Sequence, residues 1–388
     1  MILESPFVPW ADLTSDPLPA KESGPLDGQR LAVKDVFDLA GYSTGGGNPT
    51  WLDEHPNASR DADAVATLRS AGALVVGKTH TDELAFSLAG SNAHYGDLDN
   101  PRVPGSTPGG SSSGSAVAVG AGLADIGLGT DTAGSIRVPA AWCGLYGLRP
   151  TWGRIRGGGA MALGPSHDTV GLMTRSLDLL RTSALLLLEP ARAPEAGEFL
   201  VPDDLWLQAD PDVITALTPV LGRLKDVLPV QGVSTLLPSR PPASLVRTFA
   251  TTQGAQAWHT FGGWVRSEKP GLGEDVRARL EAAAALRAGE ITVAQRQAGA
   301  IRAQLLEVLA GRVMIVPTVP MTAPAPERAR SAEVRGRLLT LTVGASIAGL
   351  PALTLPLPGP GGAPIGLCLV GSPGTDEQLF GLAGALAG

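Results

Sequence analysis

The chain has 388 residues, and its 30 Lys and Arg against 37 Asp and Glu give a formal net charge of −7. This balance argues against a basic face for nucleic acid or for an anionic membrane. Charged residues make up only 17% of the chain and its mean hydropathy is +0.13, which excludes a disordered, strongly charged protein.

The predicted elements of the first half alternate between strands and helices. We expect strands around 30–40, where the pair Lys34–Asp35 interrupts an apolar run, at 73–76 and at 125–129. We expect helices at 63–70 and 81–90 and a Gly-, Pro- and Ser-rich loop over 96–115. The step from helix 63–70 to strand 73–76 is typical of a layered α/β fold.

The second half continues this alternation after an irregular stretch. Residues 190–240 are rich in proline and predict irregular structure. Helices are expected at 176–189 and 275–310, and strands at 313–320, 351–358 and 364–371.

Two motifs match known patterns, but their context argues against each. Residues 72–79 read G-x4-G-K-T, yet the four residues between the glycines form a buried strand and cannot wrap around phosphates. Residues 110–114 read G-x-S-x-G, which would make Ser112 a nucleophile. The residues before Ser112 cannot form the strand that such an elbow needs.

Other site chemistries have little support in the sequence. The five histidines show no metal-ligand spacing, and Cys143 and Cys368 lie far apart, so we expect no metal site and no disulfide. The start of the chain lacks the pattern of a signal peptide, and no apolar run reaches the ~18 residues that span a bilayer. We therefore expect a cytoplasmic protein without membrane contact.

Two segments carry more Gly and Ser than packing requires, residues 109–115 and 129–137. A run such as Thr132-Ala133-Gly134-Ser135 can turn consecutive N–H groups toward one point, which suits an oxyanion hole. Ser135 stands at the end of this run, where a nucleophile would be needed. Composition alone leaves a pair of flexible loops as an equally good interpretation.

These segments resemble the amidase signature family. PGGSSSGSAVAV, followed by GTDTAGSIRVPA, is similar to the family's signature, and Ser111 and Ser135 stand 24 positions apart, as in the family. AVKD at 32–35, GKTHTDELAFS, IVPTVPMTAPAP, ASIAGLPALTLPLP and PIGLCLVG also fit. GNPTWL, SNAHYG and the triple serine are most similar to the indole-3-acetamide hydrolase branch.

The resemblance implies the fold. We expect one α/β domain over residues 1–388, with a mixed, many-stranded central sheet covered by helices on both faces. Residues 190–300 resemble the family least, and in the family this region covers the acyl pocket.

The resemblance also implies a catalytic set of Ser135, Ser111 and Lys34. Ser135 would attack an amide carbonyl, Ser111 would relay its proton and Lys34 would be the final base. The peptide bond between Gly110 and Ser111 would be cis. The remaining implied roles are an oxyanion hole at Thr132, Ala133 and Gly134, where Ala133 replaces the usual glycine, and structural support from Asp131, Arg137, Gly110 and Ser112.

The role of Lys34 also follows from its chemistry. A lysine with its ordinary pKa of about 10.4 is almost entirely charged near pH 7.5, so it can act as a base only where burial lowers that pKa. Because successive side chains of a strand point to opposite faces, we expect Asp35 to face away from Lys34.

The expected reaction is hydrolysis of a small aryl or aliphatic primary amide to carboxylate and ammonia, the activity of a general amidase (EC 3.5.1.4), without a cofactor. His94, Trp142, Cys143 and Met161 are candidate substrate contacts. No spare cation is apparent near the catalytic residues, so we expect a neutral amide, with indole-3-acetamide as the best single example.

Two alternatives remain open. One is the glutamine-hydrolysing component of a tRNA-dependent amidotransferase, and the other is a catalytically inactive scaffold. The net charge argues against the first, and the intact set of Lys34, Ser111 and Ser135 argues against the second. A homodimer is possible.

Overall fold

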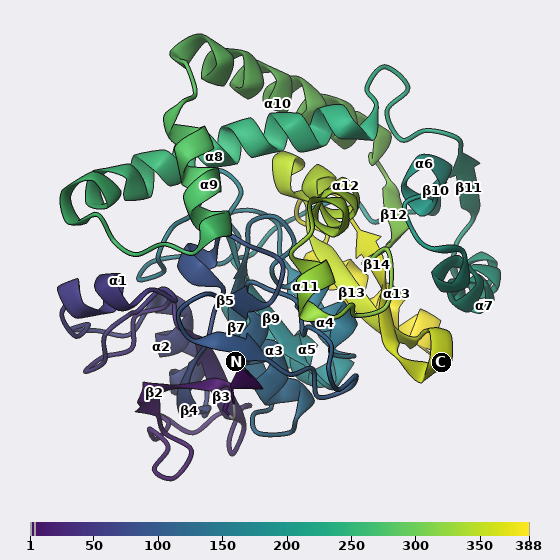
Figure 1. Cartoon of the computed structure of the whole chain (residues 1–388). Helices are drawn as coiled ribbons and strands as arrows, with labels where there is room; N and C mark the ends of the chain where they lie inside the picture. The colour runs from purple at the N-terminus through teal and green to yellow at the C-terminus, as the bar shows by residue number, and fades with distance from the viewer. Residues whose placement is uncertain (1, 4, 388) are drawn as a thin grey trace.

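An 11-stranded mixed sheet runs through the computed structural model, which describes residues 2–3 and 5–387 (Figure 1). The strands follow the order β11-β10-β12-β14-β13-β8-β9-β7-β3-β4-β2, with β3 parallel to both β4 and β7, and β7 antiparallel to β9. Their bounds are β2 (Phe7–Asp12), β3 (Arg30–Lys34), β4 (Leu74–Thr79), β7 (Ile126–Asp131), β8 (Tyr146–Arg149), β9 (Thr169–Thr174), β10 (Glu198–Pro202), β11 (Val230–Val233), β12 (Arg312–Pro317), β13 (Ala352–Pro358) and β14 (Pro364–Val370). A second, small sheet holds β1 (Ile2–Leu3), β5 (Ser91–Asn92) and β6 (Gly96–Leu98).

Helices cover both faces of the large sheet. They are α1 (Pro49–Glu54), α2 (Asp63–Ser70), α3 (Ser113–Gly120), α4 (Arg137–Trp142), α5 (Leu177–Leu187), α6 (Asp203–Trp206), α7 (Pro211–Val227), α8 (Pro242–Glu268), α9 (Glu274–Ala284), α10 (Ala288–Val308), α11 (Pro326–Ala329), α12 (Ala332–Ala348) and α13 (Asp376–Ala387), with 3-10 turns η1 (Glu83–Ala85) and η2 (Pro360–Gly362). Ala32 of β3 belongs to a buried cluster with α3 and α4, whereas its neighbours Leu31 and Val33 belong to one with α2 and α5. The alternation of strand side chains thus places helices on opposite faces. No helix in the described part of the chain combines the length and the apolarity needed to cross a bilayer.

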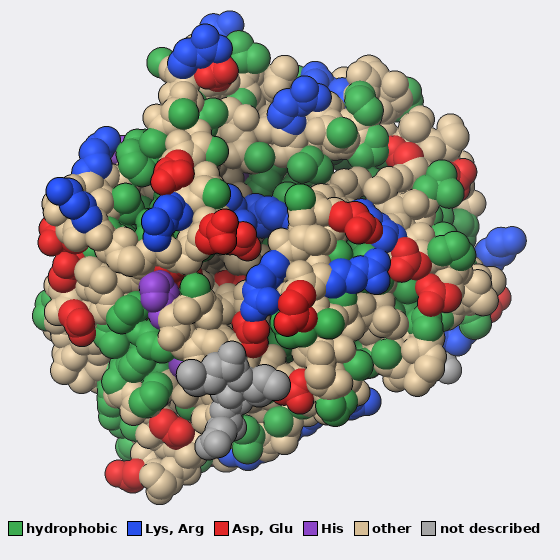
Figure 2. Space-filling view, in the orientation of Figure 1, with side chains coloured by type: hydrophobic (Ala, Val, Ile, Leu, Met, Phe, Trp, Pro, Cys, Tyr) green, Lys and Arg blue, Asp and Glu red, His purple; other side chains and the backbone are tan. Residues whose placement is uncertain are grey.

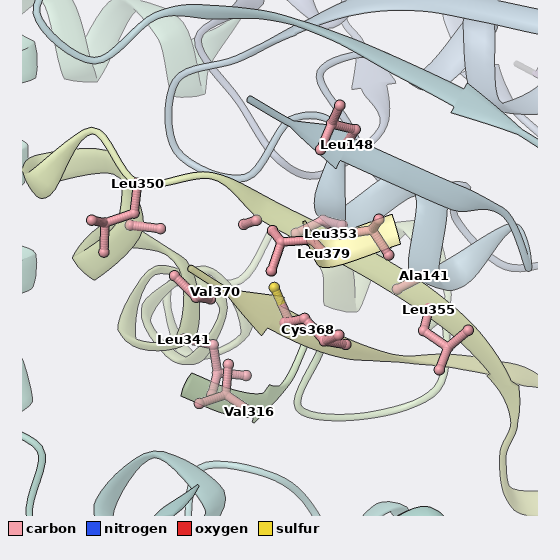
Figure 3. Packing of buried hydrophobic residues seen from close by; sticks show 14 of the residues in the cluster. Ala141, Leu148, Val316, Leu341, Leu350, Leu353, Leu355, Cys368, Val370 and Leu379 are labelled. Atoms are coloured by element: carbon pink, nitrogen blue, oxygen red, sulfur yellow. The ribbon is translucent and has the colours of Figure 1, made fainter. Parts of the chain in front are cut away.

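The core is built mainly from aliphatic side chains of the central strands. Leu148 of β8, Leu353 of β13, Val370 of β14, Leu341 of α12 and Leu379 of α13 belong to one buried cluster, part of which Figure 3 shows. Both cysteines are buried and unpaired, Cys368 within this cluster.

The expected fold class is confirmed, and several expected elements lie where the sequence places them. The helix at 63–70 matches α2, and the expected strands at 313–320, 351–358 and 364–371 correspond to β12, β13 and β14.

Other expectations are wrong. Residues 190–240 contain β10, α6, α7 and β11. Helix α7 begins with Pro211, which suits the first turn, and it forms despite Pro219 in its interior because its apolar face is buried in the core. The expected helix over 275–310 is two helices, and Glu290 caps the second by accepting a hydrogen bond from the Arg287 N–H at 2.9 Å. Only the 3-10 turn η1 forms within 81–90.

Helices α8, α9 and α10 form a group that we call the helical cap. Helix α8 packs against both α9 and α10, and α12 packs against α8 and α10. Figure 1 shows the cap along one side of the molecule, at the top of the view and above the strands of the large sheet.

Candidate active site

Lys34 is the last residue of β3, which lies between β4 and β7. Its side chain is fully buried, and its Nζ donates hydrogen bonds to the hydroxyl oxygens of Ser111 at 2.8 Å and Thr130 at 2.9 Å. Ser111 precedes α3, and Thr130 lies near the end of β7. The fold therefore brings Lys34 into direct contact with Ser111, as expected.

The surroundings of Lys34 favour its neutral form. Burial lowers the pKa of Lys34 from its ordinary value to about 7, against the opposing effect of the carboxylates of Asp82, Asp168 and Asp131. A lysine with this pKa is partly neutral near neutral pH, so its amine can accept a proton.

Asp35 faces away from Lys34, as the alternation of the strand predicts. Its Oδ1 lies 2.7 Å from Nζ of Lys78, and its Oδ2 accepts a hydrogen bond from the Gly45 N–H at 3.0 Å. Both charged groups are fully buried and form an ion pair. Lys78 lies inside β4 and is held by this pair, so the phosphate-loop pattern at 72–79 has no open loop.

Ser111 is held through its backbone. The Gly110–Ser111 peptide bond is cis, as expected. The Ser111 carbonyl accepts hydrogen bonds from the Thr81 hydroxyl at 2.9 Å and from the Asp82 N–H at 3.2 Å. A β-carbon at position 110 would lie 2.3 Å from an Asp82 carboxylate oxygen, so only glycine fits there. The neighbouring Ser112 donates a hydrogen bond to the Thr130 carbonyl at 3.3 Å, which agrees with a supporting role.

The loop after β7 is anchored by the buried carboxylate of Asp131. Arg137 donates to it at 2.8 and 2.9 Å and Arg149 at 3.0 Å. Although burial alone would raise the pKa of Asp131, Arg137 and Arg149 hold it well below its usual range. The same carboxylate accepts hydrogen bonds from the N–H groups of Gly134 at 2.9 Å and Ile136 at 3.2 Å, and so fixes the curve of the loop.

This arrangement corrects one predicted member of the oxyanion hole. The Gly134 N–H is already bonded to Asp131, and the value of this glycine lies in its φ of 129°, which other residues rarely adopt. The N–H groups of Thr132, Ala133 and Ser135 donate to no acceptor within residues 2–3 and 5–387. These three groups are the available donors for an oxyanion.

Two contacts hold this loop from outside. The Thr132 hydroxyl donates to Asp168 at 2.6 Å, and the Thr342 hydroxyl of α12 donates to the Ala133 carbonyl at 2.5 Å. Arg137 in turn donates to the Thr342 carbonyl at 2.8 Å. These bonds hold the loop between Asp168, which directly precedes β9, and helix α12.

Ser135 ends this loop just before α4, and 3% of its surface is exposed. Its hydroxyl forms no hydrogen bond with any described residue, and a direct bond to Ser111 is not formed in this arrangement. The proton relay from Ser135 through Ser111 to Lys34 therefore stays a prediction.

A cavity of about 270 Å³ lies beside these groups. Thr130, which contacts Lys34, and Asp168, which contacts Thr132, contribute polar groups to its wall. Met161 also lines it, as expected for a substrate contact. Most of the other lining residues are apolar, and they include Trp152, Ile155, Ala160 and Val170.

Three of the four predicted substrate contacts have other partners. Trp142 is fully buried and its indole N–H donates to the Met321 carbonyl at 2.9 Å, while Cys143 is buried with its sulfur 3.5 Å from the Pro108 carbonyl. Helix α4 is buried on every side, so its apolar residues form core and not a pocket wall. His94 lies 2.7 Å from a Glu83 carboxylate oxygen and does not line this cavity.

The sequence did not indicate Thr130, Arg149 or Asp168 as site residues. Thr130 could have been noticed, since it stands within the GTDTAGS run. Arg149 and Asp168 reach the site only because β8 and β9 lie next to each other in the sheet, and no local pattern marks them.

No cluster of three or more His, Cys, Asp or Glu side chains among the described residues is arranged to hold a metal ion. The candidate groups of this site are an amine, the hydroxyls of two serines and backbone N–H donors. Such a set can carry out proton transfer, nucleophilic attack and stabilisation of an oxyanion.

Comparisons with known proteins agree with this geometry. A family model described as Amidase matches residues 10–188 and 224–380. Amidase 1 of Oryza sativa subsp. japonica is 34% identical over 398 residues, 94% of this chain and 91% of that protein. A glutamyl-tRNA(Gln) amidotransferase component of Natronomonas pharaonis is 31% identical over 427 residues, 97% of this chain and 99% of that protein.

A similar solved structure, described as a crystal structure of amidase, is 32% identical. It superposes with a TM-score of 0.84 and covers 94% of this chain and 85% of that one. The match of sequence, fold and motif positions along nearly the whole chain shows that this protein belongs to the amidase signature family.

Proposed function

We propose that this enzyme hydrolyses a carboxylic primary amide to the carboxylate and ammonia through an acyl-enzyme on Ser135. Lys34 takes a proton from Ser111, and Ser111 takes one from Ser135. The Ser135 oxygen then bonds to the amide carbon, and the N–H groups of Thr132 and Ala133 face the resulting oxyanion.

In the next steps the proton moves along the same groups in the opposite direction. The proton returns through Ser111 to the leaving nitrogen, the carbon–nitrogen bond breaks and ammonia departs. Water, deprotonated by the same relay, attacks the acyl-Ser135 ester and releases the carboxylate. All of these steps use groups of the chain itself.

One observation carries the proposal. Lys34 is fully buried, has a pKa of about 7 and donates a hydrogen bond to Ser111 at 2.8 Å. A structural lysine of the same sheet, Lys78, has an acidic partner at 2.7 Å, whereas the direct partners of Lys34 are hydroxyl groups. This environment suits a base, because burial disfavours the charged amine and no carboxylate is in contact with it to offset that effect.

The apolar residues around Met161 favour a substrate whose acyl group is aryl or aliphatic, as in the general amidase reaction.

Ser135→Ala tests the nucleophile. We expect a loss of several orders of magnitude in kcat for ammonia release, because the acyl-enzyme cannot form, while the free energy of unfolding stays within about 1 kcal/mol. A sulfonyl fluoride probe should label the wild type at Ser135, as read by peptide mass spectrometry. Ser112→Ala is the matched control, and in this variant the probe should still label Ser135. Labelling at Ser112, or full activity in Ser135→Ala, would contradict the mechanism.

The amidotransferase alternative is supported by the similarity to a component of such an enzyme. It predicts that glutamine is the best amide and that a second protein is needed for activity. A purified single chain that hydrolyses other amides faster than glutamine would exclude it. Labelling of Ser135 by the probe would exclude the alternative of a catalytically inactive scaffold.

A further inference from the structure

Lys34 and Asp82 are the buried Lys, Arg, Asp and Glu side chains of the described residues that contact no oppositely charged group. Lys34 contacts the hydroxyls of Ser111 and Thr130, and Asp82 lies fully buried just before η1. The other buried side chains of these four types pair as Asp35–Lys78, Asp61–Arg69, Glu83–His94, Asp131–Arg137, Asp131–Arg149 and Asp376–Arg154. A buried charge without a partner is costly, so these two residues call for a functional explanation.

The carboxylate of Asp82 lies directly against Gly110. A β-carbon at position 110 would collide with both carboxylate oxygens of Asp82. Oδ2 accepts a hydrogen bond from the Gly90 N–H at 3.0 Å, whereas Oδ1 has no hydrogen-bond partner among residues 2–3 and 5–387. The backbone N–H of Asp82 also donates to the Ser111 carbonyl at 3.2 Å. The carboxylate therefore adjoins the segment whose serine hydroxyl accepts a hydrogen bond from Lys34.

The parallel pairing of β3 and β4 brings the two residues to the same edge of the sheet. Lys34 is the last residue of β3 and pairs in register with Thr79, the last residue of β4. Asp82 follows Thr79 by three residues. Asp82 thus reaches the segment around Ser111 from the strand next to that of Lys34.

Water does not screen the interaction between Lys34 and Asp82. Figure 2 shows acidic and basic side chains together over this face of the molecule, where water and salt weaken their interactions. Lys34 and Asp82 have no exposed surface, so each acts more strongly on the other. Burial raises the pKa of Asp82 to about 6, against the effects of the Gly90 N–H and of Lys34, so Asp82 is mostly ionised at neutral pH. Burial lowers the pKa of Lys34, and Asp82 has the largest opposing effect.

Other charged groups face this pair, but none forms an ion pair with either residue in the described part of the chain. They are Asp131 at the end of β7, Asp168 before β9, Glu83 of η1 and Arg279 of α9. The carboxylate of Asp131 is bonded to two arginines. That of Asp168 accepts hydrogen bonds from the Thr132 hydroxyl and from two backbone N–H groups. Asp82 is therefore the least compensated carboxylate that acts on Lys34.

We propose that Asp82 is a positioning residue of the reaction, whose buried carboxylate stabilises the positive charge that Lys34 gains when it takes the proton of Ser111. In this step the O–H bond of Ser111 breaks, an N–H bond forms at Nζ of Lys34, and Asp82 stays ionised. A carboxylate in contact would hold the lysine as a permanent cation, as Asp35 holds Lys78. At the distance of one residue, Asp82 leaves Lys34 partly neutral and offsets the charge that develops during proton transfer. This inference rests on the proposed function, since it concerns the same base.

Asp82→Asn tests this role, because asparagine keeps the size of the side chain and removes its charge. Without the anion the ammonium form of Lys34 is less stable, so the acidic limb of kcat/KM for a neutral amide should move about one pH unit lower. The plateau above the limb should fall by about tenfold, because the amine is then a weaker base. Since both groups are buried, the shift should be the same at about 0.05 M and at about 0.5 M salt.

A direct measurement separates this proposal from the proposed function. The carbon-13 signal of the Lys34 side chain, identified by its absence in Lys34→Met, reports the protonation of Lys34 in the free enzyme without substrate. In Asp82→Asn this signal should titrate about one pH unit lower than in the wild type. Reciprocity requires Lys34→Met to raise the pKa of Asp82 by a similar amount, as read from the carbon-13 signal of its carboxyl group. These shifts would support the role of Asp82 even if the wild type hydrolyses no amide, in which case the proposed function fails.

Asp376→Asn is the matched control. It removes a carboxylate that is also fully buried but is paired with Arg154 at 3.0 Å, and it should leave the titration of Lys34 unchanged. An unchanged titration of Lys34 in Asp82→Asn, or an equal shift in Asp376→Asn, would overturn the proposal. If Asp82→Asn does not fold, the titration of Asp82 in Lys34→Met decides alone, and an unchanged pKa of Asp82 in that variant would overturn the proposal as well.

Discussion

Lys34 and Lys78 occupy neighbouring parallel strands, and both side chains are fully buried, yet their partners differ. Lys78 faces the carboxylate of Asp35, and Lys34 faces two hydroxyls. The alternation of β3 produces this difference, because Lys34 and Asp35 are consecutive and point to opposite sides. The strand thus separates Lys34 from the neighbouring carboxylate of Asp35, and this separation distinguishes Lys34 from Lys78.

The pH dependence of activity follows from the pKa of Lys34. Because the base must be neutral, kcat/KM should rise with pH along a single limb with an apparent pKa of about 7. The measurement is kcat/KM for a neutral amide from about pH 5 to about pH 9. Lys34→Ala should lose this limb together with most activity. A flat profile in the wild type, or full activity of Lys34→Ala at neutral pH, would exclude Lys34 as the base.

At the scale of elements, buried polar side chains just before α1 and in η1 hold the start of α9 in place. Asn48 donates to the Gly271 carbonyl at 3.0 Å and to Glu83 at 2.7 Å, and Glu83 accepts a hydrogen bond from the Gly273 N–H at 2.9 Å. This set of contacts fixes the segment that leads into the helix carrying Arg279. His94, predicted to contact substrate, belongs to this set through its contact with Glu83.

Asn48→Ser tests the role of this connection. Serine keeps the N-cap of α1, where Asn48 accepts a hydrogen bond from the Trp51 N–H at 3.1 Å, but it is too short to reach Gly271. We expect faster amide hydrogen exchange in 271–284 and a loss of about 1–2 kcal/mol in unfolding free energy. Exchange in β7 and β9 serves as the internal control. Unchanged protection of 271–284 would show that Asn48 does not hold α9.

Parts of these elements could be predicted from the sequence and others could not. The strands β12, β13 and β14 are short apolar runs bounded by proline and glycine, so local pattern suffices. Helix α3 was missed because its small residues are buried on all sides and show no apolar stripe. The positions of Lys34, Ser111 and Ser135 came from the resemblance to a family, whereas Arg149 and Asp168 depend on strand neighbours that a single sequence does not reveal.

At the scale of the whole molecule, the buried Lys34 lowers stability. Its pKa is about 7 in the folded state and near 10.5 when unfolded, so the unfolded chain binds more protons between these values. The contribution of Lys34 is therefore most unfavourable below pH 7, on the order of 4 kcal/mol, and diminishes as pH rises toward 10.5.

Lys34→Met should consequently be more stable than the wild type at about pH 7, and the difference should shrink by about 2 kcal/mol at about pH 9. Urea unfolding at the two pH values measures this, and the comparison with wild type cancels the titration of other groups. Lys78→Met is the matched control and should be destabilised, because it leaves Asp35 buried without its partner. An equal stability difference for Lys34→Met at both pH values would contradict the lowered pKa.

The division between sheet and cap has an evolutionary consequence. Lys34 ends a central strand, and Ser111 and Ser135 stand in the loops that lead into α3 and α4, whereas α8, α9 and α10 of the cap carry none of these residues. A substitution in the cap can therefore leave the hydrogen bonds of Lys34 to Ser111 and Thr130 in place. Selection can therefore vary the cap while Lys34, Ser111 and Ser135 are inherited unchanged.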